Sequence, residues 1–344
     1  MNSAYQALPV EDWPAADRIA WQDACRPSLR LHRGGSACRI KPVSRVAYLR
    51  AYGYLLDFCL RTNRFDPQAV AAGHVTPAVM AAFLIELEAR VGSITRHNYL
   101  SRIERMTRLL ASGTDTAWLK EVVAELKDQI TPRSKAARII PSSRLLRLGR
   151  ELIERAKASA TGTKLQIARL HRDGLMIAML ALCPIRLKNF ASLQVGKQLR
   201  KVDEHWWIML AAEETKTGRA DQRPLPAILT PIINQWIDTY RPCFLGPGDA
   251  LWASTAGGAL AYTYVGAIIT ETVRRELGVA VNPHLFRDCA VFTVAHNAGS
   301  EMGVASALLQ HTDRRVTEAH YNRGSKVEAV KSFHRIIMAI EETA

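Results

Sequence analysis

Five short motifs with chemically capable side chains occur in one order in the second half of the 344-residue chain. In chain order they supply Arg186, Lys216, the pair His284-x-x-Arg287, His311 and Tyr321. Each residue type alone has an ordinary structural explanation, such as a helix cap for arginine or histidine and packing for tyrosine. Their combination and their order favour a catalytic interpretation.

These residue types together can cleave a phosphodiester bond. Two arginines can bind the nonbridging oxygens of one phosphate and stabilise the charge that develops there. A tyrosine phenolate can attack phosphorus and hold the strand as a phosphotyrosine. Histidine can move the tyrosine proton, and lysine can protonate the leaving 5′ oxygen. The sequence has no P-loop motif and no paired-carboxylate magnesium pattern, so we expect no metal and no nucleotide cofactor.

The charge of the chain favours a nucleic-acid partner. Lys and Arg total 46 against 32 Asp and Glu, which gives a formal net charge of +14. Cationic side chains bind phosphates and release condensed counterions. Residues 127–150 hold seven basic residues and one acidic residue, Asp128. The prolines and serines in this stretch predict an extended basic linker over residues 132–141.

Composition sets the class of protein. Hydrophobic residues make up 48% of the chain and charged residues 23%, as in ordinary globular proteins, and the length favours two domains. The longest apolar run, residues 175–185, is too short to cross a bilayer, so we expect no membrane association. The six scattered cysteines and the lack of a signal-peptide pattern predict reduced thiols in a cytoplasmic protein.

Hydrophobic periodicity predicts a helical first half. Residues 1–40 contain many breakers and are expected to form an irregular, variable arm, followed by a helical domain over residues 41–131. The predicted helices cover residues 43–61, 78–90, 96–111 and 118–130. Thr76-Pro77 is a helix start, and Ser93 or Thr95 is expected to cap the third helix. The arginines of that helix lie largely off its apolar stripe and face either solvent or DNA.

The second half is predicted to be a mixed domain over residues 142–344. Strand-forming residues at 198–202, 205–212 and 222–225 predict a small three-stranded antiparallel sheet with the last strand at an edge. Predicted helices cover residues 142–158, 164–183, 230–239, 262–277, 283–297, 302–309, 313–321 and 326–340. The fold class is therefore mainly α with a small antiparallel β-sheet (α+β).

The ordered set of motifs, which ends at Tyr321, resembles that of the tyrosine recombinases, the family of the phage integrases. The resemblance covers residues 141–321 by motif and, more weakly, residues 43–130, which are similar to the family's core-binding domain. It implies a two-domain clamp around duplex DNA, with a helical core-binding domain and a mixed catalytic domain. It also implies site-specific recombination or integration through a 3′-phosphotyrosyl intermediate, carried out by a bacterial, nucleoid-associated enzyme.

The resemblance assigns a role to each motif residue. Arg186 and Arg287 would bind the scissile phosphate, and Lys216 would act as general acid toward the 5′ oxygen. His284 would serve as acid and base. His311 would hydrogen-bond the phosphate, and Tyr321 would be the nucleophile.

Partners are implied in the same way. We expect DNA contacts from one set of basic residues: Arg96, Arg102, Arg105, Arg133, Lys135 and Arg138. Four protomers would synapse two DNA sites. The helix over residues 326–340 would dock on a neighbouring protomer through its apolar positions, and packing within its own protomer is the alternative.

The chain departs from the family pattern in three places. Asn189 stands where an acidic residue often follows the first arginine, and Gln310 stands where a glycine is usual. Ten residues rather than nine separate His311 from Tyr321, which places His320 at the usual position. Three alternatives therefore stay open: a DNA-binding accessory protein that no longer cuts, a type IB topoisomerase, and a basic RNA-binding protein.

Overall fold

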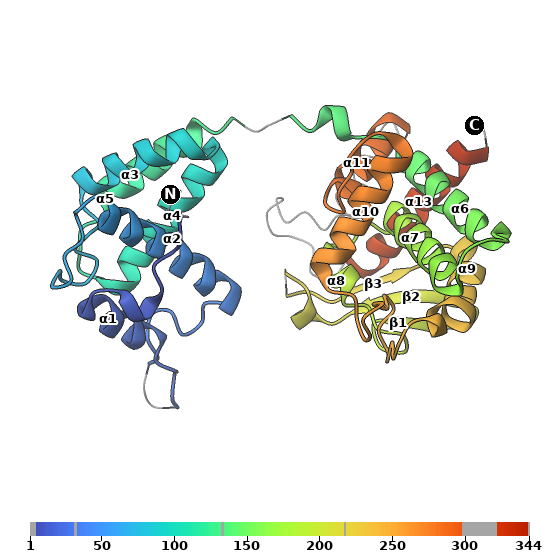
Figure 1. Ribbon diagram of the computed structural model, residues 1–344, viewed down its shortest axis with the longest axis horizontal. Coiled ribbons are helices and arrows are strands. Elements are labelled where there is room, and N and C mark those ends of the chain that lie inside the picture. Colours follow the sequence, from blue (N-terminus) through green and yellow to red (C-terminus); the bar gives the residue numbers. More distant parts are fainter. Residues whose placement is uncertain (1–4, 31–32, 132–133, 217, 298–321, 343–344) are drawn as a thin grey trace. The chain divides into compact units, whose positions relative to one another are not determined.

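The chain folds into two compact units, Met1–Ser134 and Lys135–Ala344, each with its own hydrophobic core (Figure 1). The computed structural model describes residues 5–30, 33–131, 134–216, 218–297 and 322–342. Its helices and single three-stranded antiparallel sheet confirm the predicted α+β class. No described helix has both the length and the apolar character that a membrane span needs.

The first unit is built around one central helix, α4. Its helices are α1 (Ala15–Cys25), α2 (Pro42–Arg61), α3 (Pro77–Arg90), α4 (Ser93–Leu110) and α5 (Ala117–Asp128), with a 3₁₀ turn at Val10–Asp12. Helix α4 contacts each of the other four helices. Its buried side chains recur every three or four residues, as the periodicity predicts: Leu100, Ile103, Met106 and Leu110.

The prediction of an irregular arm over residues 1–40 needs correction. These residues contain helix α1, and the side chains of Trp13 and Trp21 are buried. Asp17 of α1 is also buried, where it accepts hydrogen bonds from Tyr52 Oη (2.8 Å) and Ala72 N (2.6 Å). Prolines and glycines around α1 weaken its periodic signal, but its tryptophans give it apolar surface to bury.

Two helix starts test the capping predictions. Thr76 caps α3 as expected, because its Oγ1 accepts a hydrogen bond from Val79 N at 3.3 Å. The cap predicted for α4 is wrong, since the helix begins at Ser93 itself and Gly92 precedes it. The Ser93 hydroxyl instead lies 3.3 Å from the carbonyl oxygen of Thr131, which ties the end of the unit to α4.

The second unit centres on two closely packed helices, α6 (Ser142–Ala158) and α7 (Lys164–Leu182). A Cβ placed on Gly149 of α6 would lie 2.7 Å from the backbone nitrogen of Ala178, so the backbones meet at glycine. Thr163 and Gln166 form a capping box that starts α7. The apolar run of the sequence, residues 175–185, is buried. It covers the C-terminal part of this helix and the three residues that follow it.

The three predicted strands form a meander in the order β1-β2-β3. They are β1 (Leu199–Val202), β2 (His205–Leu210) and β3 (Asp221–Pro224). The tight turn between the first two strands includes Asp203 with φ 52°. Strand β3 lies at the edge and begins at Asp221, one residue earlier than predicted.

Further helices surround this core: α8 (Leu187–Ala191), α9 (Thr230–Gln235), α10 (Tyr262–Leu277), α11 (Leu285–Asn297) and α13 (Asn322–Glu342). Helix α9 continues as a π-helical turn, Trp236–Tyr240. Short 3₁₀ turns occupy Ala136–Arg138, Ala212–Glu214, Ala227–Leu229 and Arg241–Cys243. The helices predicted at 302–309 and 313–321 lie outside the described residues.

The C-terminal helix α13 packs within its own unit, on α6, α7, α11 and β3 (Figure 1). Val330, Phe333 and Ile337 are buried there, and His334 Nε2 lies 3.0 Å from the carbonyl oxygen of Leu182. These are among the apolar positions expected to dock on a neighbouring protomer. In this chain their apolar surface is covered in cis.

Candidate active site

Arg186 lies in the turn between two helices of the second unit. Helix α7 ends at Leu182, and α8 begins at Leu187. Pro184 prevents α7 from continuing, and Arg186 precedes α8 with the extended backbone angles φ −66° and ψ 139°. Its side chain is half-buried. A cap at the end of a helix, the ordinary structural explanation for an arginine, therefore does not apply to Arg186, because the residue stands at the start of α8.

His284 and Arg287 lie on either side of the start of α11. The side-chain oxygen Oδ1 of Asn282 accepts hydrogen bonds from the backbone nitrogens of His284 (3.0 Å) and Leu285 (3.1 Å). An asparagine in this position satisfies amide groups that a helix start leaves unpaired. His284 is exposed in the turn, and Arg287 is buried in the first turn of the helix. The predicted start at Pro283 is two residues too early.

Arg287 joins α11 to the turn that carries Arg186. Its Nη1 donates a hydrogen bond of 2.7 Å to the carbonyl oxygen of Pro184. Burial lowers the pKa of Arg287 to about 10, and the positive charges of Arg186 and Arg223 add to this effect. Arg287 therefore contacts the turn that carries Arg186, and it stays protonated at neutral pH.

The same group of charges acts on His284. Although His284 is exposed, partial desolvation lowers its pKa from the ordinary value. The charge of Asp288 opposes this, and Lys135, Arg287 and Arg186 lower the pKa further. The imidazole is therefore neutral at pH 7. A neutral imidazole beside two guanidinium groups can accept a proton while the guanidinium groups hold an anion.

Lys216 lies in the connection between β2 and β3. The hydroxyl of Thr215 orders this connection, since it accepts a hydrogen bond from Arg219 N (3.0 Å) and donates to a carbonyl oxygen. Lys216 is exposed. Its approach to the phosphate stays a prediction. His311 and Tyr321 lie outside the described residues, and helix α13 begins directly after Tyr321.

Sequence reasoning missed a buried ion pair in strand β3. Asp221 and Arg223 are 6% and 3% exposed, and Arg223 Nη2 lies 3.0 Å from Asp221 Oδ2. The interpretation of β3 as a polar edge strand gave these side chains no buried partner. Their spacing of two residues was the available signal, because it places both on one face of a strand.

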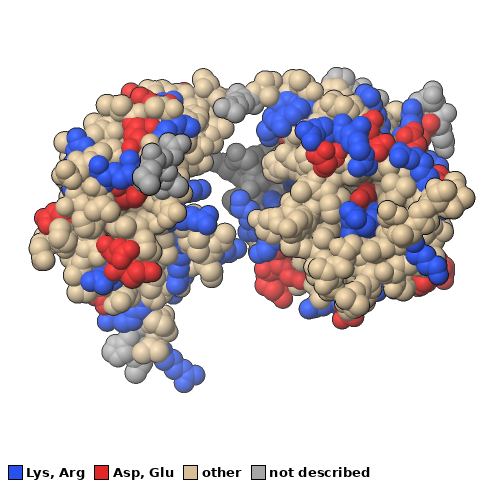
Figure 2. Space-filling model, viewed as in Figure 1, with Lys and Arg blue, Asp and Glu red and all other residues tan. Residues whose placement is uncertain are grey.

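The residues predicted to bind DNA have different surroundings. On α4, Arg96 pairs with Glu88 at 2.7 Å, and Arg102 and Arg105 are partly exposed. Lys135 pairs with Asp288 at 3.1 Å, and Arg138 is exposed. Arg133 lies outside the described residues. Both units carry Lys and Arg on the visible surface, interspersed with Asp and Glu (Figure 2).

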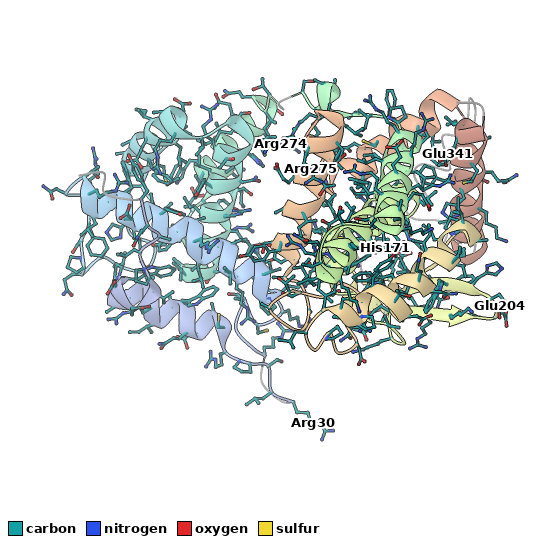
Figure 3. All side chains as sticks on the ribbon, turned by 45° about the vertical axis from the view of Figure 1, so that its right-hand side comes forward. Arg30, His171, Glu204, Arg274, Arg275 and Glu341 are labelled. Atoms are coloured by element: carbon teal, nitrogen blue, oxygen red, sulfur yellow. The ribbon has the colours of Figure 1, made fainter. Side chains whose placement is uncertain are left out.

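His171, labelled in Figure 3, is another buried titratable group of the second unit. It lies on α7 with its ring centroid 6.1 Å from that of Trp236 and 4.3 Å from that of Tyr240. Burial lowers its pKa to about 4. His171 is a core residue. Among the described residues, no group of three or more His, Cys, Asp or Glu side chains is arranged to hold a metal ion.

Comparisons with known proteins connect this geometry to solved folds. No protein-family model matches the chain, and no curated protein matches its sequence. The XerH site-specific recombinase bound to difH substrate, in a pre-cleavage complex, is 15% identical with a TM-score of 0.50; the match covers 88% of this chain and 78% of XerH. XerH in a post-cleavage complex with palindromic difH is 13% identical with a TM-score of 0.51, over 88% and 76%.

A third solved structure, the integrase from mycobacterium phage Brujita, is 15% identical with a TM-score of 0.39, over 96% of this chain and 98% of the integrase. The XerH likeness spans both units of the chain. This likeness shows that the chain has a tyrosine-recombinase-like fold.

Proposed function

We propose that this protein is a site-specific DNA recombinase that cuts and rejoins duplex DNA through a 3′-phosphotyrosyl intermediate. One observation carries the proposal: Arg287 donates a hydrogen bond to the Pro184 carbonyl, two residues before Arg186, within a fold similar to that of a site-specific recombinase. XerH is bound to its difH substrate in the similar structures. Duplex DNA is the corresponding partner here.

The reaction follows from these groups. The two guanidinium groups bind the nonbridging oxygens of the scissile phosphate and stabilise the charge of the pentacoordinate transition state. The Tyr321 oxygen attacks phosphorus and loses its proton to His284. The bond from phosphorus to the 5′ oxygen breaks, and Lys216 protonates that oxygen. The same steps in reverse join the phosphate to a new 5′ hydroxyl.

Binding to DNA rests on the surplus of positive charge. The net charge of +14 and the basic residues of α4 and of the connection before α6 favour phosphate contacts. If about six phosphates are neutralised, log K against log salt should have a slope of about −5. A flat plot would contradict DNA binding by a clamp. Assembly of four protomers on two DNA sites is part of the proposal.

Covalent trapping tests the chemistry. The protein is incubated in EDTA with nicked suicide duplexes that carry candidate sites from flanking DNA, in parallel with the Tyr321→Phe variant. A protein–DNA adduct that resists denaturation and is missing from the variant is the expected result. An adduct that persists in the variant would assign the nucleophile elsewhere, with His320 the first position to replace. Specific binding without any adduct would overturn the proposal in favour of an accessory DNA-binding protein.

A relaxation assay separates the enzyme classes. Relaxation of supercoiled DNA by a single protomer, without synapsis of two sites, would identify a topoisomerase. Products that join segments from two duplexes identify a recombinase.

A further inference from the structure

Strand β3 of the second unit carries a buried carboxylate, Asp221. Both oxygens of Asp221 accept hydrogen bonds from Arg223 Nε, at 3.0 and 3.1 Å, and Oδ2 also accepts one from Nη2 at 3.0 Å. The two residues oppose Leu210 and Ile208 of β2 in the sheet register, on the buried face. This two-point geometry fixes the orientation of the carboxylate.

Asp221 influences Arg287 through its charge. Arg223 hydrogen-bonds the side chain of Cys183, and Arg287 bonds the carbonyl oxygen of the next residue, Pro184, so both guanidinium groups contact the same turn. The negative charge of Asp221 raises the pKa of Arg287, whereas Arg186 and Arg223 lower it. Arg287 is anchored on one side by its hydrogen bond to the Pro184 carbonyl. The buried guanidinium groups of Arg223 and Arg287 and the half-buried one of Arg186 repel one another, and a buried anion offsets part of that repulsion.

Fold stability alone does not account for this pair. Replacement of a buried ion pair by apolar side chains of similar size is often neutral or stabilising. Strand β3 lies at the sheet edge and packs on α13, where apolar residues would serve the core equally well. The charges of Asp221 and Arg223 instead act on Arg287, one of the two arginines proposed to bind the scissile phosphate.

We propose that Asp221, oriented by Arg223, is a positioning residue that holds the Arg287 guanidinium in its phosphate-binding place. The inference rests on the proposed function and deepens it. It adds strand β3 to the elements that build the site: the α7–α8 turn supplies Arg186, α11 supplies Arg287, and β3 supplies the counter-charge. Asn189, which follows Arg186 by three residues, brings no charge of its own.

Cleavage by three variants gives the first test. Asp221→Asn removes the charge and keeps the size, and should slow single-turnover cleavage at saturating DNA by about 100-fold with unchanged DNA affinity. The double variant Asp221→Asn/Arg223→Met restores the net charge of the cluster. It should cleave at least about tenfold faster than Asp221→Asn. Asp173→Asn is the matched control, because it removes the anion of another, partly buried ion pair of this unit, Arg172–Asp173, and should leave cleavage unchanged.

A readout independent of cleavage gives the second test. Selectively labelled arginine Nε–Hε signals are recorded for the full-length protein, and the Arg287 signal is identified with Arg287→Lys. Asp221→Asn should shift the Arg287 signal and speed its hydrogen exchange, whereas Asp173→Asn should not. An Arg287 signal that is the same in Asp221→Asn overturns the inference, and so does a double variant as slow as the single one. A shifted signal in a protein that forms no DNA adduct supports the inference and overturns the proposed function instead.

Discussion

Asp17 of the first unit and Asp221 of the second are both buried carboxylates, and they have different partners. In the first unit, Asp17 accepts hydrogen bonds from neutral donors, Tyr52 Oη and Ala72 N, and burial raises its pKa. In the second unit, Asp221 faces the permanently charged Arg223. The burial of the two carboxylates is similar, at 0% and 6% exposure, so their partners make the difference.

The comparison separates a structural role from a chemical one. Asp17 joins segments 35 and 55 residues away and has no described arginine neighbour, so it serves the assembly of the helices. Asp221 bonds a residue two positions away and adds little to the assembly of distant segments. Its charge acts on Arg287 instead. Substitution of Asp17 should therefore change stability, and substitution of Asp221 should change cleavage.

The largest effect is expected for the two arginines proposed to bind the scissile phosphate, Arg186 and Arg287. Arg287→Ala and Arg186→Ala should each slow cleavage about 1,000-fold, because each removes a donor to the transition-state charge. DNA affinity should stay nearly unchanged, since each arginine is one of many cationic contacts. Single-turnover cleavage and DNA titration measure the two quantities. Arg155→Ala, which removes an exposed arginine paired with Glu276, is the control. Parallel losses of affinity and cleavage would contradict a specific catalytic role.

The next effect is expected in the first unit. Asp17→Ala leaves two buried donors unpaired and should lower the unfolding free energy of this unit by about 3 kcal/mol. Hydrogen exchange resolved by peptide in the full chain should show the loss in residues 1–134 and not in residues 135–344. Asp23→Ala, at an exposed position of α1, is the matched control. Equal loss of protection in both units would remove the distinction between them.

Acid should destabilise the second unit more than the first. His171 and His334 have pKa values lowered to about 4, so the unfolded chain binds more protons between pH 6.5 and pH 4. Their stabilising contribution is complete above pH 6.5 and is lost as pH falls toward 4, by up to about 3 kcal/mol for each histidine. In the first unit the lowered pKa of His74 acts in the same direction, but the raised pKa of Asp17 opposes it.

Unfolding of each unit against pH checks this order. His171→Phe should reduce the acid sensitivity of the second unit, and His205→Gln, at an exposed position, should not change it. Unfolding of the first unit at a higher pH than the second would contradict this prediction.

The smallest effect is expected at the exposed pair Lys135–Asp288. Lys135→Gln should cost less than 1 kcal/mol of stability, as for most surface ion pairs. Lys135 is one of the charges that lower the pKa of His284, so its removal should raise that pKa. If His284 accepts the proton, the acid limb of the cleavage profile should move to higher pH. A profile that does not move would assign the proton to another group.

Local patterns predicted most of the secondary structure. The sequence predictions for α6 and α10 have the bounds that the structure shows, because their apolar spacing and flanking breakers are unambiguous. The Asp203-Glu204 turn also follows from local chemistry. Helix α1 was missed because prolines surround it, and the tryptophans that stabilise it act through contacts with residues far along the chain.

The motif residues were also recognisable in the sequence, but their surroundings were not. The pair His284-x-x-Arg287 is local, since both residues belong to one helix start. The bond from Arg287 to Pro184 crosses 103 residues, and no local pattern encodes such a distance. Strand β3 shows the same limit, because burial of its charged residues depends on what packs against them.

The sequence by itself therefore determined the element types, the basic charge of the chain and the order of the reactive side chains, because these depend on composition and on spacing within a few residues. Only the tertiary structure decided that α1 belongs to the first core, that α13 is covered in cis and that Asp221 and Arg223 form a buried ion pair. Burial and electrostatic coupling depend on which distant segments meet. That meeting is settled by packing of the whole chain, where each charge acquires its neighbours.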